Sequence, residues 1–372
     1  MPAAPRPVTR LVVKVGTSVL TDARGRLLPG RLRRLAGQVA RCCREQRQVI
    51  VVTSGAVACG MAAFGLRARP KGLAQLQACA AVGQGKLMHR YTTLFRRRGL
   101  LTAQVLLTQE DLADRSRFRN AKQTLLTLLH RRVVPIVNEN DTVSVEEITF
   151  GDNDRLAALV AAAVDAHLLI ILSDVDGLYR DGRLVDRVDA VDQSVRAAVR
   201  DAGRALTKGG MASKLEAARI VGHGGIPMVL ANGARPTVLT DVLAGRPAGT
   251  LFAPPPNRLR ATQWWLAFAL RRPQGAVTID DGAAAAVVGQ RRSLLASGVA
   301  GVRGPFAAGA YVAVLDRKGR EVARGVCRLS SEQLGRIQGL RSAEAARSLG
   351  VARVPEVIHR DHLVILEDVA HG

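Results

Sequence analysis

The sequence lacks an uninterrupted apolar run that could cross a bilayer, because Asp165 and His167 interrupt its longest apolar stretch, residues 156–172. It also lacks an apolar segment before Leu11, so we expect neither a secretory signal nor membrane association. Its five cysteines are an odd, scattered set without C-x-x-C spacing. This excludes a disulfide framework and a structural zinc site, and it favours small buried thiols in a reducing, cytoplasmic environment.

Four common catalytic motifs are also missing. The sequence contains no G-x-x-x-x-G-K-[ST], G-x-G-x-x-G, G-x-S-x-G or H-E-x-x-H. The nearest approach to the first motif is Gly85-Lys86, but Leu87 follows it and Ala80 replaces the first glycine. A P-loop ATPase, a dinucleotide-binding fold, a hydrolase with a nucleophile elbow and a zinc protease are therefore disfavoured.

Acidic residues are few relative to basic ones: 31 Asp and Glu stand against 54 Lys and Arg, a formal charge of +23. Such a balance suggests a polyanionic partner such as RNA. Only 7 of the cations are lysines and 47 are arginines, which favours genomic base composition as the cause. Residues 275–357 hold 12 Lys or Arg and 7 Asp or Glu. Their net +5 matches an even distribution of the total, so RNA remains an alternative that salt-dependent binding would have to support.

Short apolar runs alternate with longer amphipathic segments up to about Phe252. The expected strands are residues 11–15, 49–52, 133–137, 168–172 and 227–230. The expected helices are residues 31–47, 73–97, 117–129, 155–164 and 211–221. Continuous Val, Ile and Leu strands separated by helices predict an α/β fold, in which helices cover both faces of a mostly parallel sheet.

The pattern changes after Pro254, Pro255 and Pro256, which cannot continue a helix or a central strand. From Gly275, short strand-like runs alternate with glycine-rich turns, which predicts a small β-barrel or sandwich. These runs are VTIDDG, AVVGQ, LLASGVAGVRG, YVAVLDRKG and EVARGVCRL. We therefore expect a first domain over residues 1–253, a linker over 254–274, a second domain over 275–357 and a tail over 358–372.

Polar and glycine-rich residues follow each expected strand of the first domain. The runs begin at Gly16, Thr53, Asn138, Ser173 and Ala231. Ligands of open parallel sheets bind outside the carboxyl ends of the strands, so we expect these runs to converge on one crevice. Turn formation is the better explanation of any single run taken alone, since Gly, Ser, Asn and Asp are common turn residues.

Two of the scarce lysines occupy unusual positions. Lys14 lies inside an apolar strand, where a cation is costly unless it is paired or faces a ligand. Lys214 follows a Gly-Gly pair at the start of an expected helix, where backbone amides and the helix N-terminus favour an anion. The two lysines and this helix start are suited to a triphosphate. The run FGDNDR over residues 150–155 suits N-capping, metal-ion chemistry or holding lysines in place.

Six segments, in this order, resemble the glutamate 5-kinases, a group of the amino acid kinase family. They are VVKVGTSVLT, VVTSGAVACG, VPIVNENDTV, FGDNDRLAALVA, LSDVDGLY and GGMASKLEAARIV. The resemblance spans about Leu11 to Val357 and implies an αβα sandwich followed by a small PUA-like β-barrel. It implies phosphorylation of the γ-carboxylate of L-glutamate by ATP with Mg²⁺, the first step of proline synthesis. It further implies a homo-oligomer that proline inhibits.

The resemblance also implies residue roles. Lys14 and Lys214 correspond to lysines that contact phosphates, and Asp154 to the acid that orients them. The implied glutamate site is Ser54, Asp141 and Asn153. The implied nucleotide site is Lys14, Ser173, Asp174, Lys208, Gly209, Gly210, Met211, Ala212, Ser213 and Lys214, and no protein ligand is implied for the metal.

Three questions stay open in the sequence. Lys208 stands where the family has a small residue, and it would either add a phosphate contact or crowd the nucleotide. Another carboxylate or carbamate kinase of the same fold is an alternative enzyme. An RNA-binding protein with a degenerate kinase domain is the alternative from a different class.

Overall fold

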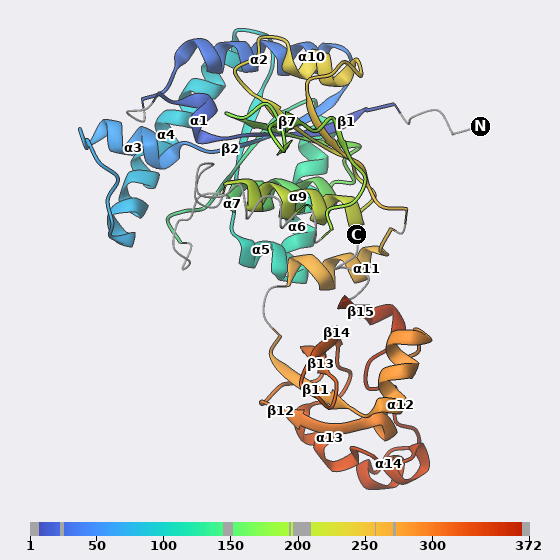
Figure 1. The fold of residues 1–372 in the computed structure, drawn as a ribbon. Helices are drawn as coiled ribbons and strands as arrows, with labels where there is room; N and C mark the ends of the chain where they lie inside the picture. Colours follow the sequence, from blue (N-terminus) through green and yellow to red (C-terminus); the bar gives the residue numbers. More distant parts are fainter. Residues whose placement is uncertain are drawn as a thin grey trace. The chain divides into compact units, whose positions relative to one another are not determined.

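The computed structural model describes residues 7–22, 26–143, 152–192, 195, 210–256, 258–270 and 273–366 (Figure 1). The chain divides into two compact units, Met1–Arg258 and Leu259–Gly372. No helix in the described ranges is long and apolar enough to cross a membrane.

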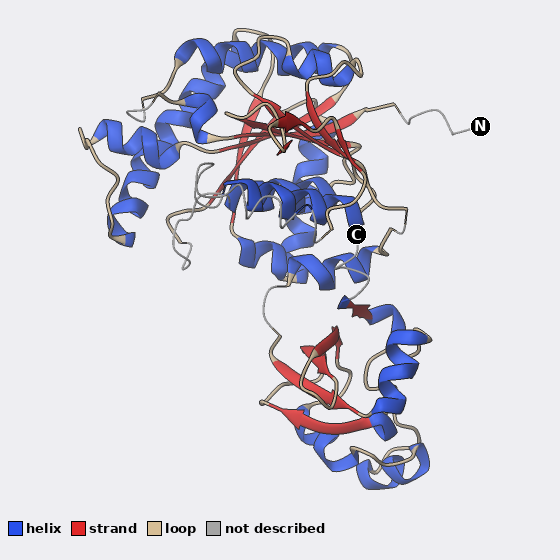
Figure 2. Ribbon diagram, in the orientation of Figure 1, coloured by secondary structure: helices blue, strands red, loops and turns tan. Residues whose placement is uncertain are grey.

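The first unit is built on an eight-stranded sheet (Figure 2). Its strand order is β3 (Thr102–Leu107), β4 (Val134–Glu139), β2 (Gln48–Thr53), β1 (Arg10–Val15), β5 (Leu168–Ser173), β9 (Met228–Asn232), β10 (Gly249–Phe252) and β8 (Arg187–Val188). Strands β3 to β9 in this order are parallel to their neighbours, whereas β10 is antiparallel to β9. The expected mostly parallel α/β sheet is therefore confirmed.

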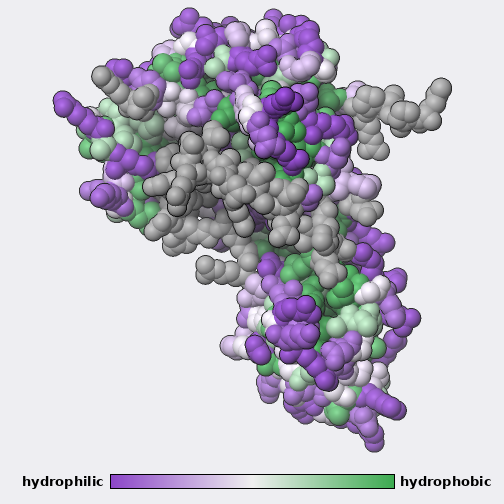
Figure 3. Space-filling model, viewed as in Figure 1, coloured by the Kyte–Doolittle hydropathy of each residue, from purple (hydrophilic) through white to green (hydrophobic). Residues whose placement is uncertain are grey.

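Helices cover both faces of this sheet, because its central strands are apolar on both sides. One layer contains α2 (Pro29–Arg44), α4 (Leu73–Arg96) and α10 (Val238–Leu243). The other contains α6 (Arg115–His130), α7 (Asp152–Ala163) and α9 (Gly210–His223). The outer side of α2, at the top of Figure 3, is hydrophilic, while its inner side packs into the core.

Alternation along β1 decides which layer each of its side chains meets. Leu11, Val13 and Val15 join the apolar cluster that includes residues of α2 and α4. Lys14 therefore points to the opposite face, where α7 and α9 lie. The otherwise apolar centre of β1 therefore places the Lys14 side chain in the layer that contains α7 and α9.

Besides the two-residue β8, two strands of this sheet were not expected from the sequence. The segment that forms β3, TAQVLL, mixes polar and apolar residues, and its side chains are mostly half-buried at the sheet edge. The segment that forms β10 is only four residues long, and it becomes a strand by pairing with β9. Neither has the continuous apolar pattern that marks the central strands.

The second unit contains a five-stranded sheet with its own apolar core. Its order is β12 (Val299–Arg303), β11 (Gly275–Ile279), β13 (Tyr311–Leu315), β14 (Glu321–Val326) and β15 (Leu363–Ile365). All neighbours are antiparallel except β11 and β13, which are parallel. Two helices, α13 (Ser331–Ile337) and α14 (Ser342–Leu349), contribute buried side chains to this core.

The second unit differs from the sequence prediction in two segments. The expected strand at residues 286–290 is wrong: this segment is helical, because Asp280 caps α12 (Asp281–Ala284) and an alanine run continues it. The short helix that the sequence predicts around Trp264 and Trp265 is confirmed at residues 261–269, where the Tyr311 hydroxyl donates to the Leu266 carbonyl at 2.6 Å. Residues 363–365 of the expected tail form β15, which pairs with β14.

Candidate active site

Three charged side chains meet between β1, α7 and α9. The Nζ of Lys14 lies 2.7 Å from Oδ1 of Asp154, and the Nζ of Lys214 lies 3.2 Å from Oδ2. The Ser213 hydroxyl donates to the same Oδ2 at 2.8 Å. Lys214 also donates to the carbonyl of Gly210 at 2.9 Å. One carboxylate therefore holds two cations from segments that lie 200 positions apart in the sequence.

Because these side chains are buried, the charges of the cluster strongly affect the pKa values of Asp154 and Lys14. The Asp154 side chain is 1% exposed, and the Lys14 side chain is 8% exposed. Burial alone would raise the pKa of Asp154, but Lys14 and Lys214 outweigh it and hold that pKa below its usual value. Burial lowers the pKa of Lys14, and Lys214 adds to this, whereas Asp154 opposes it. Asp154 thus favours the charged form of the lysine that it contacts.

The strand registers place polar residues beside this cluster. Val15 pairs with Thr53 of β2 and with Leu172 of β5, so the carboxyl ends of these three strands coincide. The Gly16 amide donates to the Leu172 carbonyl at 3.0 Å. Gly55, with a left-handed φ of 108°, turns the chain directly after Ser54 into α3 (Ala56–Ala63).

A chain of amides and a hydroxyl lies next to the charged cluster. The Asn153 amide donates to the Ser54 hydroxyl at 3.0 Å and is 3.2 Å from Oδ1 of Asn138. The Asn138 amide in turn donates to Oε1 of Gln84 at 2.9 Å. The Oδ1 of Asn153 is buried without a hydrogen-bond partner among the described residues. A ligand donor placed here would satisfy it.

Asn153 and Asp154 are consecutive residues in the first turn of α7. The side chain of Asn153 reaches Ser54, while that of Asp154 reaches the two lysines. The start of α7 therefore places the hydrogen-bonding groups around Asn153 next to two lysine ammonium groups that are suited to binding phosphate. Two neighbouring reactants could be held there, one on each side of the α7 terminus.

Asp141 follows β4 and lines a small cavity that Gln84 also lines. Gln84 in turn bonds Asn138, which bonds Asn153, so the expected glutamate residues are linked through these two amides. The sequence analysis did not assign roles to Asn138 or Gln84. The polar run after the fourth strand contains Asn138, but Gln84 lies within a long helix and gave no signal.

Apart from Lys14 of β1, the expected nucleotide residues that the structure describes lie at the end of β5 and at the start of α9. Ser173 ends β5, and its hydroxyl donates to Oδ1 of Asp174 at 3.0 Å. Asp174 also acts electrostatically on Lys14, whose charged form it favours. Gly210, Met211, Ala212, Ser213 and Lys214 form the first residues of α9. Lys208 and Gly209 lie outside the described residues.

The parallel strands bring two buried lysines and a helix N-terminus together near their carboxyl edge. The amino acid kinase family matches residues 9–232, and the PUA domain matches residues 275–349. The chain belongs to the amino acid kinase family.

Several bacterial relatives of this chain carry the same name. It is 45% identical over 364 residues to the glutamate 5-kinase of Moorella thermoacetica, covering 96% of each chain. It is 48% identical over 368 residues to the glutamate 5-kinase of Thermus thermophilus, covering 96% of this chain and 98% of that one. The glutamate 5-kinase of Streptomyces avermitilis is 47% identical over 367 residues.

A solved structure with low sequence similarity shares the fold. N-acetylglutamate synthase from Neisseria gonorrhoeae, solved with coenzyme A and N-acetyl-glutamate, superposes with a TM-score of 0.51 at 16% identity. The match covers 66% of this chain and 60% of that chain. At this identity the likeness concerns the fold alone.

Proposed function

We propose that this chain transfers the γ-phosphoryl group of ATP to the γ-carboxylate of L-glutamate. The products are L-glutamyl 5-phosphate and ADP, and the reaction is the first step of proline biosynthesis. The observation that carries this proposal is the pairing of Asn153 with Asp154 at the start of α7, which joins hydrogen-bonding groups to two lysines. The names of the relatives support the choice of glutamate and ATP. We assign the reaction to residues 1–253.

The acceptor carboxylate needs no catalytic base, because it is already ionised at neutral pH. One of its oxygens attacks the γ-phosphorus, a new O–P bond forms, and the bond to the ADP oxygen breaks. Lys14 and Lys214 offset the negative charge on the transferring group and the leaving oxygen. Asp154 favours the charged form of Lys14 and holds both ammonium groups in place.

On the acceptor side, Ser54 and Asn153 hydrogen-bond to glutamate. The unpaired Oδ1 of Asn153 accepts from the α-ammonium group, and Asp141 adds a negative charge for the same group. Asn138 and Gln84 hold the amide of Asn153 in its orientation. On the donor side, Ser173, Asp174 and the first turn of α9 lie against the nucleotide, where the helix N-terminus favours phosphate.

We propose that Mg²⁺ arrives with ATP, bound to its phosphate oxygens. Within the described residues, no group of three or more His, Cys, Asp or Glu side chains is arranged to hold a metal ion. Both oxygens of Asp154 already face lysines, so this carboxylate does not fit a preformed metal site.

We also propose that proline competes with glutamate, as the resemblance implies, because both carry an α-carboxylate and an α-nitrogen. Proline should then raise the apparent KM for glutamate and leave that for ATP unchanged. A homo-oligomer is proposed on the same resemblance, and its test is the mass of the protein in solution. The charge of residues 275–357 gives no separate reason to propose RNA as a partner.

The test of the reaction is trapping of the acyl phosphate by hydroxylamine. The protein, ATP, Mg²⁺ and glutamate should give γ-glutamyl hydroxamate, and omission of glutamate should abolish it. Lys14→Ala should reduce the rate by a factor of about 10² or more. Lys122→Ala removes a lysine whose ion pair with Asp165 is exposed, and it should retain the parent rate. Absence of glutamate-dependent hydroxamate, or a hydroxamate only with another acid, would refute the proposal.

A further inference from the structure

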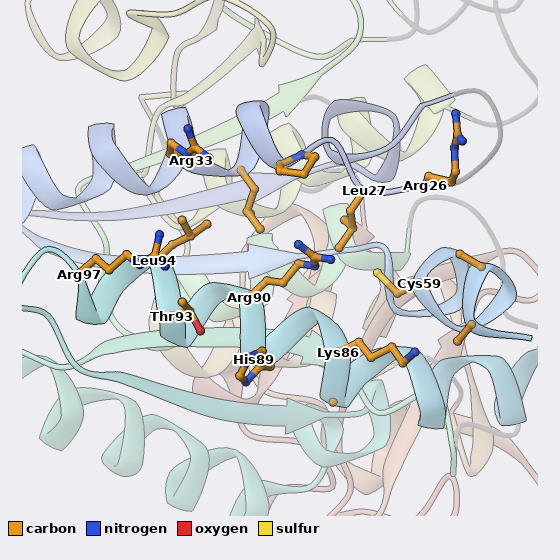
Figure 4. Close-up of a pocket in the computed structure, with 15 residues that line it drawn as sticks. Arg26, Leu27, Arg33, Cys59, Lys86, His89, Arg90, Thr93, Leu94 and Arg97 are labelled. Atoms are coloured by element: carbon orange, nitrogen blue, oxygen red, sulfur yellow. The ribbon is translucent and has the colours of Figure 1, made fainter.

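A cleft of about 820 Å³ lies on the helical layer formed by α2, α3 and α4 (Figure 4). The charged side chains among its described lining residues all carry positive charge: Arg26, Arg33, Lys86, Arg90 and Arg97. His89 lines it as well, and no Asp or Glu is among these lining residues. The cleft shares no residue with the candidate active site.

Helical spacing gathers several of these groups into one stripe. Lys86, Arg90, Thr93 and Arg97 recur at steps of three or four residues, so they line a single side of α4. Arg33 comes from α2, which forms the facing wall. Figure 4 shows Arg90 and Lys86 extending from α4 into the space between these elements.

These cations have little internal compensation. Arg26 pairs with Asp22 at 2.9 Å. Arg33, Lys86, Arg90 and Arg97 make no ion pair within the part of the chain that the structure describes. Like charges gathered in one cleft repel each other, and a bound anion removes that repulsion.

We propose that this cleft binds a small molecule that carries a chain of phosphate groups. Arginine binds phosphate oxygens in a bidentate manner, and lysine adds a point charge. The volume lies within the range of about 300–1,000 Å³ that is typical of small-molecule sites. Leu27, Leu32 and Leu94 give the cleft an apolar wall, which suits an organic group attached to the phosphates.

The structure also connects this cleft to the glutamate site of the proposed function. Gln84, two residues before Lys86, bonds Asn138. Tyr91, next to Arg90, hydrogen-bonds Thr53 at 2.8 Å, directly before Ser54. An added Cβ at Gly83 would lie 1.8 Å from the Ala56 carbonyl oxygen, so α3 and α4 are in backbone contact. Occupancy of the cleft therefore shifts the affinity for glutamate, a consequence that rests on the proposed function.

The test uses inorganic tripolyphosphate as the probe and the full chain as the protein. Binding is measured by calorimetry without nucleotide and with Mg²⁺ in excess over the probe, so that tripolyphosphate can occupy both the nucleotide site and the cleft. We expect binding beyond the nucleotide site. A Lys86→Gln/Arg90→Gln variant should weaken this second site by about tenfold or more. Both side chains are exposed, so the variant retains its packing.

The matched control is Arg119→Gln/Lys122→Gln, which removes the same two charges from α6 in the opposite helical layer. It should bind tripolyphosphate like the parent. Absence of a second site, or equal weakening in both variants, would overturn the proposal. The proposal would also be overturned if single-stranded RNA displaced tripolyphosphate at a lower concentration of phosphate groups than that of the probe. The cleft would then be a binding site for RNA.

A kinetic measurement tests the connection separately. Tripolyphosphate should change the KM for glutamate in the parent and leave it unchanged in Lys86→Gln/Arg90→Gln. Binding without a change in KM would refute the coupling. Because calorimetry does not depend on enzyme activity, the binding result can be interpreted even if the proposed kinase reaction is refuted.

Discussion

The ammonium group of Lys14 lies 2.7 Å from Oδ1 of Asp154, inside a layer where both side chains are almost fully buried. A buried charge without its partner is strongly destabilising, since its desolvation is no longer offset. Lys214 occupies the other oxygen of the same carboxylate. We therefore expect substitution of Asp154 to have the largest effect on the site, although this carboxylate contacts the lysines and does not itself react.

Asp154→Asn should abolish most of the activity and weaken the fold. The two lysines lose their counter-charge, so we expect a loss of about 10² or more in kcat and of about 3–5 kcal/mol in the free energy of unfolding. Hydroxamate formation and denaturant titration measure the two effects. Asp165→Asn, at an exposed ion pair, should change stability by less than about 1 kcal/mol. Similar stability losses in both variants would contradict this assignment.

Acid should narrow the stability difference between the parent and Asp154→Asn. The pKa of Asp154 is lowered from its usual 3.8 in the folded chain, so its stabilising contribution is complete above that value. As the pH falls through the lowered pKa, Asp154 becomes protonated and the contribution disappears. Denaturant titrations should show the same gap at about pH 7 and pH 5, and a gap that closes as the pH falls from about 3.8 towards 2. A gap independent of pH would mean that the carboxylate charge is not its source.

Gln84→Ala should affect glutamate more than ATP. The substitution removes the acceptor for the Asn138 amide, which in turn lies against Asn153. We expect the KM for glutamate to rise by roughly tenfold, with the KM for ATP within about twofold. Gln84→Glu keeps an acceptor and should recover part of the affinity. Gln75→Ala, on the exposed surface of the same helix, should match the parent; an equal effect there would indicate a general loss of α4 structure.

Gly83→Ala and Gly85→Ala should change stability in opposite directions. A Cβ at Gly83 would lie 1.8 Å from the Ala56 carbonyl oxygen, so α3 and α4 must separate, at a cost of about 1–3 kcal/mol. A Cβ at Gly85 has nothing within 4 Å, and the higher helix propensity of alanine should stabilise by roughly 0.5–1 kcal/mol. Thermal and denaturant unfolding measure both. Destabilisation by Gly85→Ala would show that α4 constrains both positions.

The local pattern of the sequence was informative where burial is continuous. The apolar runs of β1, β2, β4, β5 and β9 are long enough to predict strands, and the polar residues after them predict a common edge. Segments whose structure depends on a partner were not predictable. The half-buried β3 and the short β10 become strands through pairing, and residues 286–290 continue a helix that begins upstream.

The sequence by itself determined the α/β pattern, the unusual positions of Lys14 and Lys214, and the family of the chain. Only the tertiary structure decided that one carboxylate, Asp154, contacts both lysines. It also decided that Gln84 accepts a hydrogen bond from Asn138 and that cations of α2 and α4 line one cleft. The physical reason is that spacing along the chain fixes which face a side chain occupies, whereas the packing of distant elements fixes what it meets there.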